Sequence, residues 1–144
     1  MCVTNAQRDV PVDVARLGRL TRCAVRLLRV RARGTLAVTF IGTERMRRLN
    51  RRFLRHDRPT DVLSFRYDGA PIVGEILIAP GVARAYAARH RLSYLEELGR
   101  YVVHGLLHWL GHGDRTPAQQ RRMRALEDHL LARCMGNQSI VHSR

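Results

Sequence analysis

The chain has 144 residues, of which 45% are apolar and 26% charged, as in globular proteins of one domain. All 26 basic residues are arginine, and with only 12 acidic residues the net charge is +14. No apolar run approaches the roughly 18 to 20 residues that cross a bilayer, and residues 1–13 contain no uninterrupted apolar block. We therefore expect a cytoplasmic protein without a signal peptide or membrane span. The excess of base over acid indicates a polyanionic partner, and it favours nucleic acid over a membrane surface.

The predicted elements alternate between strands and helices. Strands are predicted at 1–5, 35–41, 61–67 and 72–79, and helices at 12–33, 43–55, 80–90, 94–110 and 117–133. Ser93 and Thr116 begin capping sequences for the last two helices. This order predicts a mixed α/β (α+β) domain over residues 1–135, with a small sheet of about four strands, helices packed on it, and residues 136–144 as a flexible tail.

The three cysteines, Cys2, Cys23 and Cys134, are far apart and form no CxxC pair. This pattern is not typical of a disulfide framework or a cysteine zinc site, and we expect neither.

A pair of histidines marks the helix at 94–110. His104 and His108 are four residues apart, so both imidazoles lie on one helix face and can bind one metal ion. On a continuous helix His112 would lie about 12 Å from His104, too far for one ion. If the helix breaks at Gly111, either His112 or Asp114 can return to the pair. Spacing alone leaves the third ligand open.

Three protein ligands leave a fourth position for water, which is the pattern of catalytic zinc. Zinc lowers the pKa of bound water to about 7 and so supplies hydroxide at neutral pH. Gly105 stands where zinc peptidases of the HExxH type carry their glutamate base, which argues against a peptidase.

A second candidate site is the basic segment 50–65. Its arginines have the forked geometry that binds phosphate oxygens, and the candidates for holding RNA are Arg51, Arg52, Arg55 and Arg58.

Together these segments resemble the YbeY family of bacterial rRNA maturation factors. The motifs that carry the resemblance are PTDVLSF at 59–65, GEI at 74–76 and HGLLHWLG at 104–111. The resemblance implies a metal-dependent, single-strand-specific endoribonuclease with its metal site at the end of a central helix. One zinc ion is the expected cofactor, and other divalent metals are the alternatives. It implies action on ribosomal RNA, in processing of the small-subunit rRNA 3′ end and in ribosome quality control, with the ribosome as partner.

Two positions depart from the family pattern. The third family histidine lies ten residues after the first, where this chain has Asp114, so the resemblance favours Asp114 over His112 as ligand. The family's catalytic arginine corresponds to Leu54 here, and Arg55, one residue later, is the candidate to replace it. The alternative functions are a ribosome-binding assembly factor with a structural ion, and a metallohydrolase of another substrate.

Overall fold

The computed structural model describes residues 1–31, 34–54, 61–67 and 72–136. Within this part of the chain, the elements are β1 (Cys2–Ala6), α1 (Val14–Leu27), β2 (Thr35–Ile41), α2 (Thr43–Leu49), the π-helical turn η1 (Asn50–Leu54), β3 (Val62–Arg66), β4 (Ile72–Ile78), α3 (Pro80–His90), α4 (Tyr94–Trp109) and α5 (Pro117–Cys134). Strands and helices follow in the predicted order, which confirms the mixed α/β fold. Beyond residue 136, the predicted tail lies outside the described residues.

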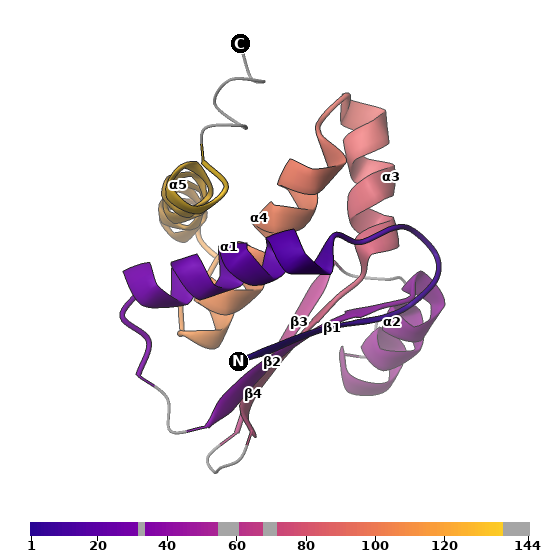
Figure 1. Cartoon of the computed structure of the whole chain (residues 1–144), viewed down its shortest axis with the longest axis horizontal. Coiled ribbons are helices and arrows are strands. Elements are labelled where there is room, and N and C mark those ends of the chain that lie inside the picture. The colour runs from indigo at the N-terminus through magenta and orange to yellow at the C-terminus, as the bar shows by residue number, and fades with distance from the viewer. Residues whose placement is uncertain (32–33, 55–60, 68–71, 137–144) are drawn as a thin grey trace.

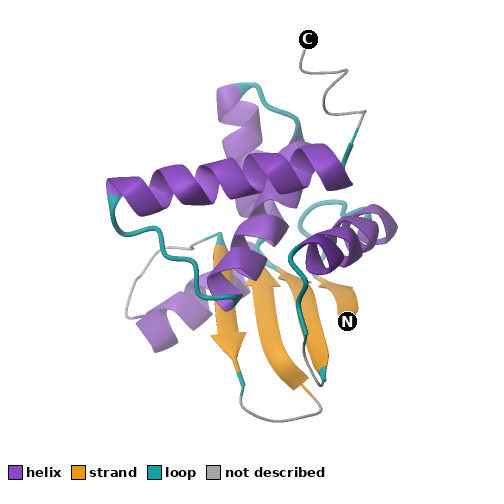
Figure 2. Cartoon of the chain, turned by 90° about the vertical axis from the view of Figure 1, so that its left-hand side faces the viewer, coloured by secondary structure: helices purple, strands orange, loops and turns teal. Residues whose placement is uncertain are grey.

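The strands form one mixed sheet in the order β1-β2-β4-β3 (Figure 2). β2 pairs in parallel with both β1 and β4, whereas β3 runs antiparallel to β4. The strands predicted at 61–67 and 72–79 are therefore antiparallel neighbours in the sheet.

The two faces of the sheet carry separate cores, because side chains alternate along a strand. One face packs against α1 and α4, through buried residues that include Val38, Phe40 and Ile76, and α5 packs on these two helices. On the other face Leu77 packs with Met46 of α2. Figure 1 shows α2 on the opposite side of the sheet from α1 and α4. Helix α4 thus lies in the thicker layer, with α3 and α5 beside it.

Helix α1 is shorter than predicted. It ends at Leu27, because Arg29 adopts a left-handed conformation with φ of 53° and the Val30 amide bonds to the Val25 carbonyl at 3.1 Å. The left-handed position that ends a helix in this way is usually occupied by glycine. The helix end predicted from Gly34 was therefore wrong.

The expectation of no disulfide was also wrong. Cys23 of α1 and Cys134 at the end of α5 form a disulfide, with Cα atoms 5.6 Å apart and a sequence separation of 111. The two cysteines meet because α1 and α5 pack together, and their sequence separation gives no sign of that.

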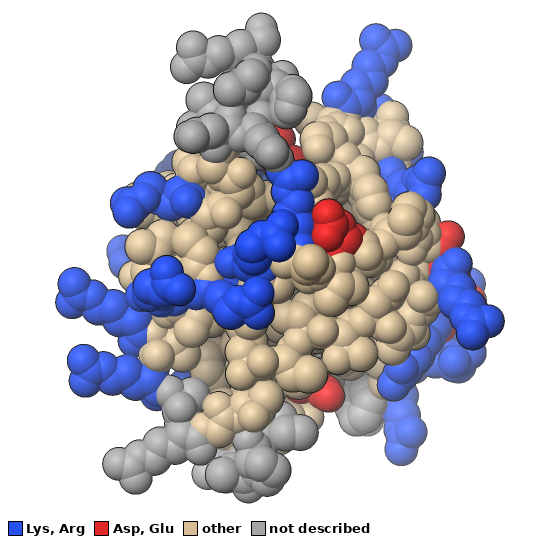
Figure 3. All heavy atoms as spheres, in the orientation of Figure 1, with Lys and Arg blue, Asp and Glu red and all other residues tan. Residues whose placement is uncertain are grey.

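The basic residues are spread over the surface. Figure 3 shows many arginine side chains projecting from one face, with few carboxylates among them. Arg19, Arg22 and Arg26 of α1 are all exposed. In the part of the chain that the structure describes, no helix combines the length and apolarity needed to cross a membrane.

Candidate metal centre

Helix α4 carries the histidine pair and is fixed closely to the sheet. Ser93 caps its start, accepting a hydrogen bond from the Glu96 amide at 3.2 Å. Gly105 faces the sheet, where the Ser64 hydroxyl donates to its carbonyl at 2.8 Å. A Cβ on Gly105 would lie 2.6 Å from Ile76, so only glycine allows this approach. The side chains of His104 and His108 lie on another face of the helix.

The loop after α4 reverses direction at Gly111, whose φ is 101°. The amide of His112 closes this turn by bonding to the Leu107 carbonyl at 3.0 Å. The chain then returns along α4 and places Asp114 beside the two histidines, with Gln120 donating to the Asp114 carbonyl at 3.0 Å. The predicted helix break at Gly111 is thus present.

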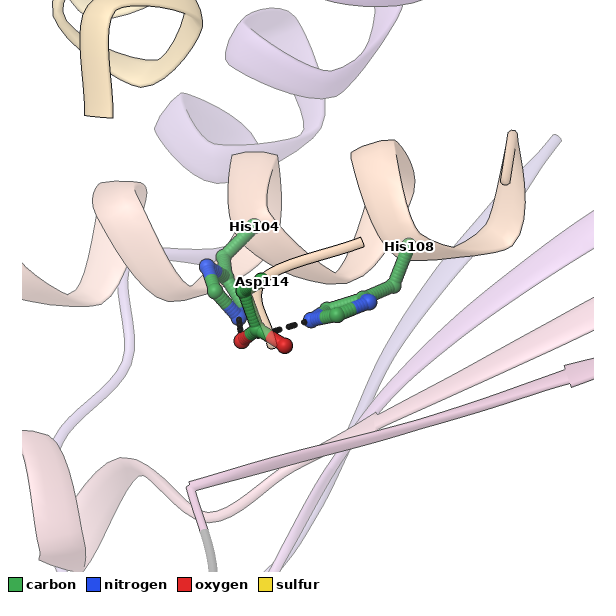
Figure 4. Close-up of side chains that lie close together, drawn as sticks. All are labelled: His104, His108 and Asp114. Carbon is green, nitrogen blue, oxygen red and sulfur yellow. Dashed lines mark hydrogen bonds and ion pairs between the residues drawn. The ribbon is translucent and has the colours of Figure 1, made fainter. Parts of the chain in front are cut away.

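Three potential ligand atoms converge at this point (Figure 4). Oδ2 of Asp114 lies 3.2 Å from Nε2 of His108 and 3.6 Å from Nε2 of His104. Ligands bound tetrahedrally to zinc at 2.0–2.1 Å are about 3.3 Å apart, so this spacing fits one ion. The ligand atoms of His104, His108 and Asp114 all lie within 4.8 Å of one another. Among the described residues no other group of three or more metal-binding side chains is this close, and His112 is not part of this one.

The donor set also suits a catalytic ion. Two imidazole nitrogens and one carboxylate oxygen are ordinary zinc ligands, and three protein ligands leave one coordination position open. The side chains of His104, His108 and Asp114 are 24%, 32% and 41% exposed, so that position can be reached from solvent. A sealed structural ion would need a fourth protein ligand.

Glu127 of α5 orients His104 and is a residue that sequence reasoning missed. It is only 4% exposed, and its carboxylate accepts from Nδ1 of His104 at 2.6 Å and from Arg100 at 2.9 Å. Burial lowers the pKa of His104, but the hydrogen bond and charge of Glu127, with smaller contributions from Asp61 and Asp114, outweigh it and raise the pKa overall. With the proton on Nδ1, the Nε2 lone pair faces Asp114.

The predicted RNA contacts are only partly described. Arg51 and Arg52 lie in η1 with exposed side chains that make interactions of their own. Arg55 and Arg58 lie outside the described residues.

Comparisons with known proteins agree with the motifs. The model of the family Endoribonuclease YbeY matches residues 2–135. An endoribonuclease YbeY from Thermobifida fusca is 38% identical over 137 residues, covering 88% of this chain and 88% of the relative. One from Geobacillus kaustophilus is 38% identical over 111 residues, covering 68% and 71%. The solution structure of TM1509 from Thermotoga maritima shares the fold, with a TM-score of 0.63 at 21% identity over 92% of this chain and 90% of that one. The chain belongs to the endoribonuclease YbeY family.

Proposed function

We propose that this chain is an endoribonuclease that processes ribosomal RNA with the help of one metal ion held by His104, His108 and Asp114. Membership of a family of endoribonucleases supports RNA cleavage. The observation that carries the role of the metal is the convergence of three ligand atoms with a solvent-facing side left open. The finer proposals are zinc as the ion, single-stranded RNA at the small-subunit rRNA 3′ end as substrate, a role in ribosome quality control, and the cytoplasmic ribosome as partner.

The residues of the metal centre determine the chemistry that a bound ion would supply. A zinc ion in this site would polarise a phosphate oxygen or supply a water of lowered pKa. The aspartate ligand makes the site one charge less positive than three neutral histidines would, so such a water is less acidic. Glu127 holds the His104 ring with Nε2 toward the site. Cleavage by direct hydrolysis and by attack of the RNA 2′-hydroxyl are both compatible with this arrangement.

We further propose that arginines outside the metal centre hold the RNA backbone. Arg51 and Arg52 are exposed and follow α2 directly. For Arg58 as a phosphate contact and Arg55 as the stabiliser of charge at the reacting phosphate, the support is the sequence motif alone.

The test uses zinc-loaded protein and a fragment of small-subunit rRNA precursor. We expect wild type to cleave it, and His108→Ala to bind it without cleavage. His129→Ala is a matched control, because His129 is exposed on α5 and belongs to no ligand group among the described residues. Binding without cleavage by the wild type would instead indicate an assembly factor with a structural ion. Loss of zinc in His112→Ala but not in Asp114→Ala would overturn the ligand set.

A further inference from the structure

A cavity of about 490 Å³ opens beside the metal centre, between α3, α4 and α5. His104 and Asp114 form part of its wall. A molecule bound in the cavity would therefore lie next to the metal ion. The volume is within the range of about 300 to 1,000 Å³ that small-molecule sites occupy.

Two polar residues that are more than nine-tenths buried line this cavity and offer their polar atoms to it. Glu97 is 9% exposed and Tyr101, one turn later on α4, is 7% exposed. Neither the carboxylate nor the phenol forms a hydrogen bond or close ion pair with any residue that the structure describes. Burial raises the pKa of Glu97, although the charges of Arg100 and Arg124 lower it. Their polar atoms open into the cavity, because the buried unpartnered side-chain atoms among the described residues belong to Arg47 and Asn50 instead. A ligand in the cavity can therefore form the hydrogen bonds that water otherwise makes with Glu97 and Tyr101.

The charges on the wall indicate which part of an RNA can enter. Among the residues that the structure describes, four acidic residues and two arginines line the cavity. A bound ion would attract a phosphate to Asp114, but Glu97 lies seven residues before His104 on α4, and beside its carboxylate an uncharged base is favoured over a phosphate. Tyr86 of α3, 38% exposed, also lines the cavity and offers a ring on which a base can stack. Single-stranded RNA is commonly recognised through unstacked bases held in this way.

We propose that the cavity is a subsite for one unstacked guanine, in a nucleotide next to the bond that is cleaved; this inference rests on the proposed function. Guanine presents two adjacent N–H donors, N1–H and the N2 amino group, which match the two oxygens of the Glu97 carboxylate. Its O6 accepts a hydrogen bond from the Tyr101 hydroxyl. Uracil presents an imino N–H between two carbonyl oxygens, which face the carboxylate unfavourably.

Binding of short 2′-O-methyl oligonucleotides, measured by fluorescence anisotropy with zinc-loaded protein, tests the subsite. We expect wild type to bind a uridine run that contains one guanine about tenfold more tightly than an all-uridine run, within the range that one bidentate contact discriminates. Glu97→Gln replaces one acceptor by a donor and loses this preference. Glu96→Gln makes the same charge change on the neighbouring residue, which does not line the cavity, and retains it.

A second variant keeps the test meaningful if Glu97→Gln does not fold. Tyr86→Ser removes an exposed ring and is expected to weaken binding of the guanine oligonucleotide about fivefold or more. Tyr67→Ser is its control, because Tyr67 is 45% exposed and lies outside the cavity wall.

The outcomes separate this inference from the proposed function. Equal binding of the two oligonucleotides by wild type, or a guanine preference that survives Glu97→Gln, overturns the subsite while RNA cleavage by wild type still stands. Binding of an arginine-rich peptide that depends on Glu97 and does not compete with RNA also overturns it, and assigns the cavity to a protein partner. Failure of wild type to bind or cleave any RNA refutes the proposed function itself.

Discussion

Replacing Glu127 by glutamine is expected to weaken zinc binding while preserving the fold. The buried carboxylate accepts the Nδ1 proton of His104 at 2.6 Å and thereby keeps the Nε2 lone pair directed toward Asp114. Glutamine has nearly the same shape but carries no charge, and its amide has only one oxygen acceptor. Arg100 also bonds to Glu127, so this single oxygen cannot serve both donors as well as the carboxylate does.

The expected loss of zinc affinity in Glu127→Gln follows from the contacts that Glu127 makes with His104 and Arg100. Loss of a partner that orients a metal-binding histidine typically costs 10- to 100-fold in metal affinity, or about 1.4 to 2.7 kcal/mol. Because glutamine retains one acceptor, we expect the smaller effect, about tenfold. Arg100 keeps its second bond, to Asp128 at 2.8 Å, which limits the damage to packing between α4 and α5.

Competition with a chromophoric chelator measures the zinc affinity of wild type, Glu127→Gln and Asp128→Asn. The comparison belongs at about pH 8, because Glu127 raises the pKa of His104 and protons compete with zinc at lower pH. Asp128 is 58% exposed and bonds to Nη2 of Arg100, whereas Glu127 bonds to Nη1 and to His104, so Asp128→Asn should bind zinc as wild type does. Ring nitrogen shifts of His104 would report whether the proton leaves Nδ1 in Glu127→Gln. Zinc affinity within about twofold of wild type in Glu127→Gln, or an equal loss in Asp128→Asn, would refute the orienting role.

Three further expectations concern stability. Burial raises the pKa of Glu97, so the protonated side chain stabilises the fold below about pH 4 and this contribution is lost as pH rises through the raised pKa. Glu97→Gln should therefore raise the Tm at neutral pH but not at about pH 4. A lower Tm of Glu97→Gln at neutral pH would contradict this. Gly105→Ala places a Cβ 2.6 Å from Ile76, and overpacking of about 1 to 3 kcal/mol should outweigh the roughly 1 kcal/mol of helix propensity gained; an unchanged urea midpoint would show that α4 can move away. Reduction of the Cys23–Cys134 disulfide should lower the free energy of unfolding by about 2 to 4 kcal/mol, and coincident urea curves with and without reductant would disprove it.

The features that were predicted correctly from the sequence are those that short-range sequence patterns determine. Periodicity and capping residues predicted the order of strands and helices, and the four-residue spacing of His104 and His108 predicted their shared face. The choice of Asp114 as third ligand needed the family resemblance, because a chain that reverses at Gly111 can bring either His112 or Asp114 back to the histidine pair. The structure now places Asp114, and not His112, beside the pair.

What the sequence did not predict depends on which helices pack together. Glu127 meets His104 only because α5 lies against α4, and the Cys23–Cys134 disulfide forms only because α5 also lies against α1. One signal for Glu127 was present: it lies four residues after Met123 and four before Leu131, within a stripe of buried residues. A carboxylate in such a stripe needs a polar partner inside the protein, which points toward a nearby histidine or arginine.

The distribution of charge indicates how the metal ion and the arginines divide RNA binding. The chain is strongly basic, yet the described residues that line the cavity beside the metal centre include more carboxylates than guanidinium groups. Asp114 and Glu127 therefore make the apo centre unfavourable for phosphate, and a bound divalent ion reverses that local charge. Arginines spread over the surface can hold an RNA backbone without metal, because their attraction acts over about a Debye length. It follows that metal should control where a phosphate sits at the centre more than whether RNA binds to the protein at all.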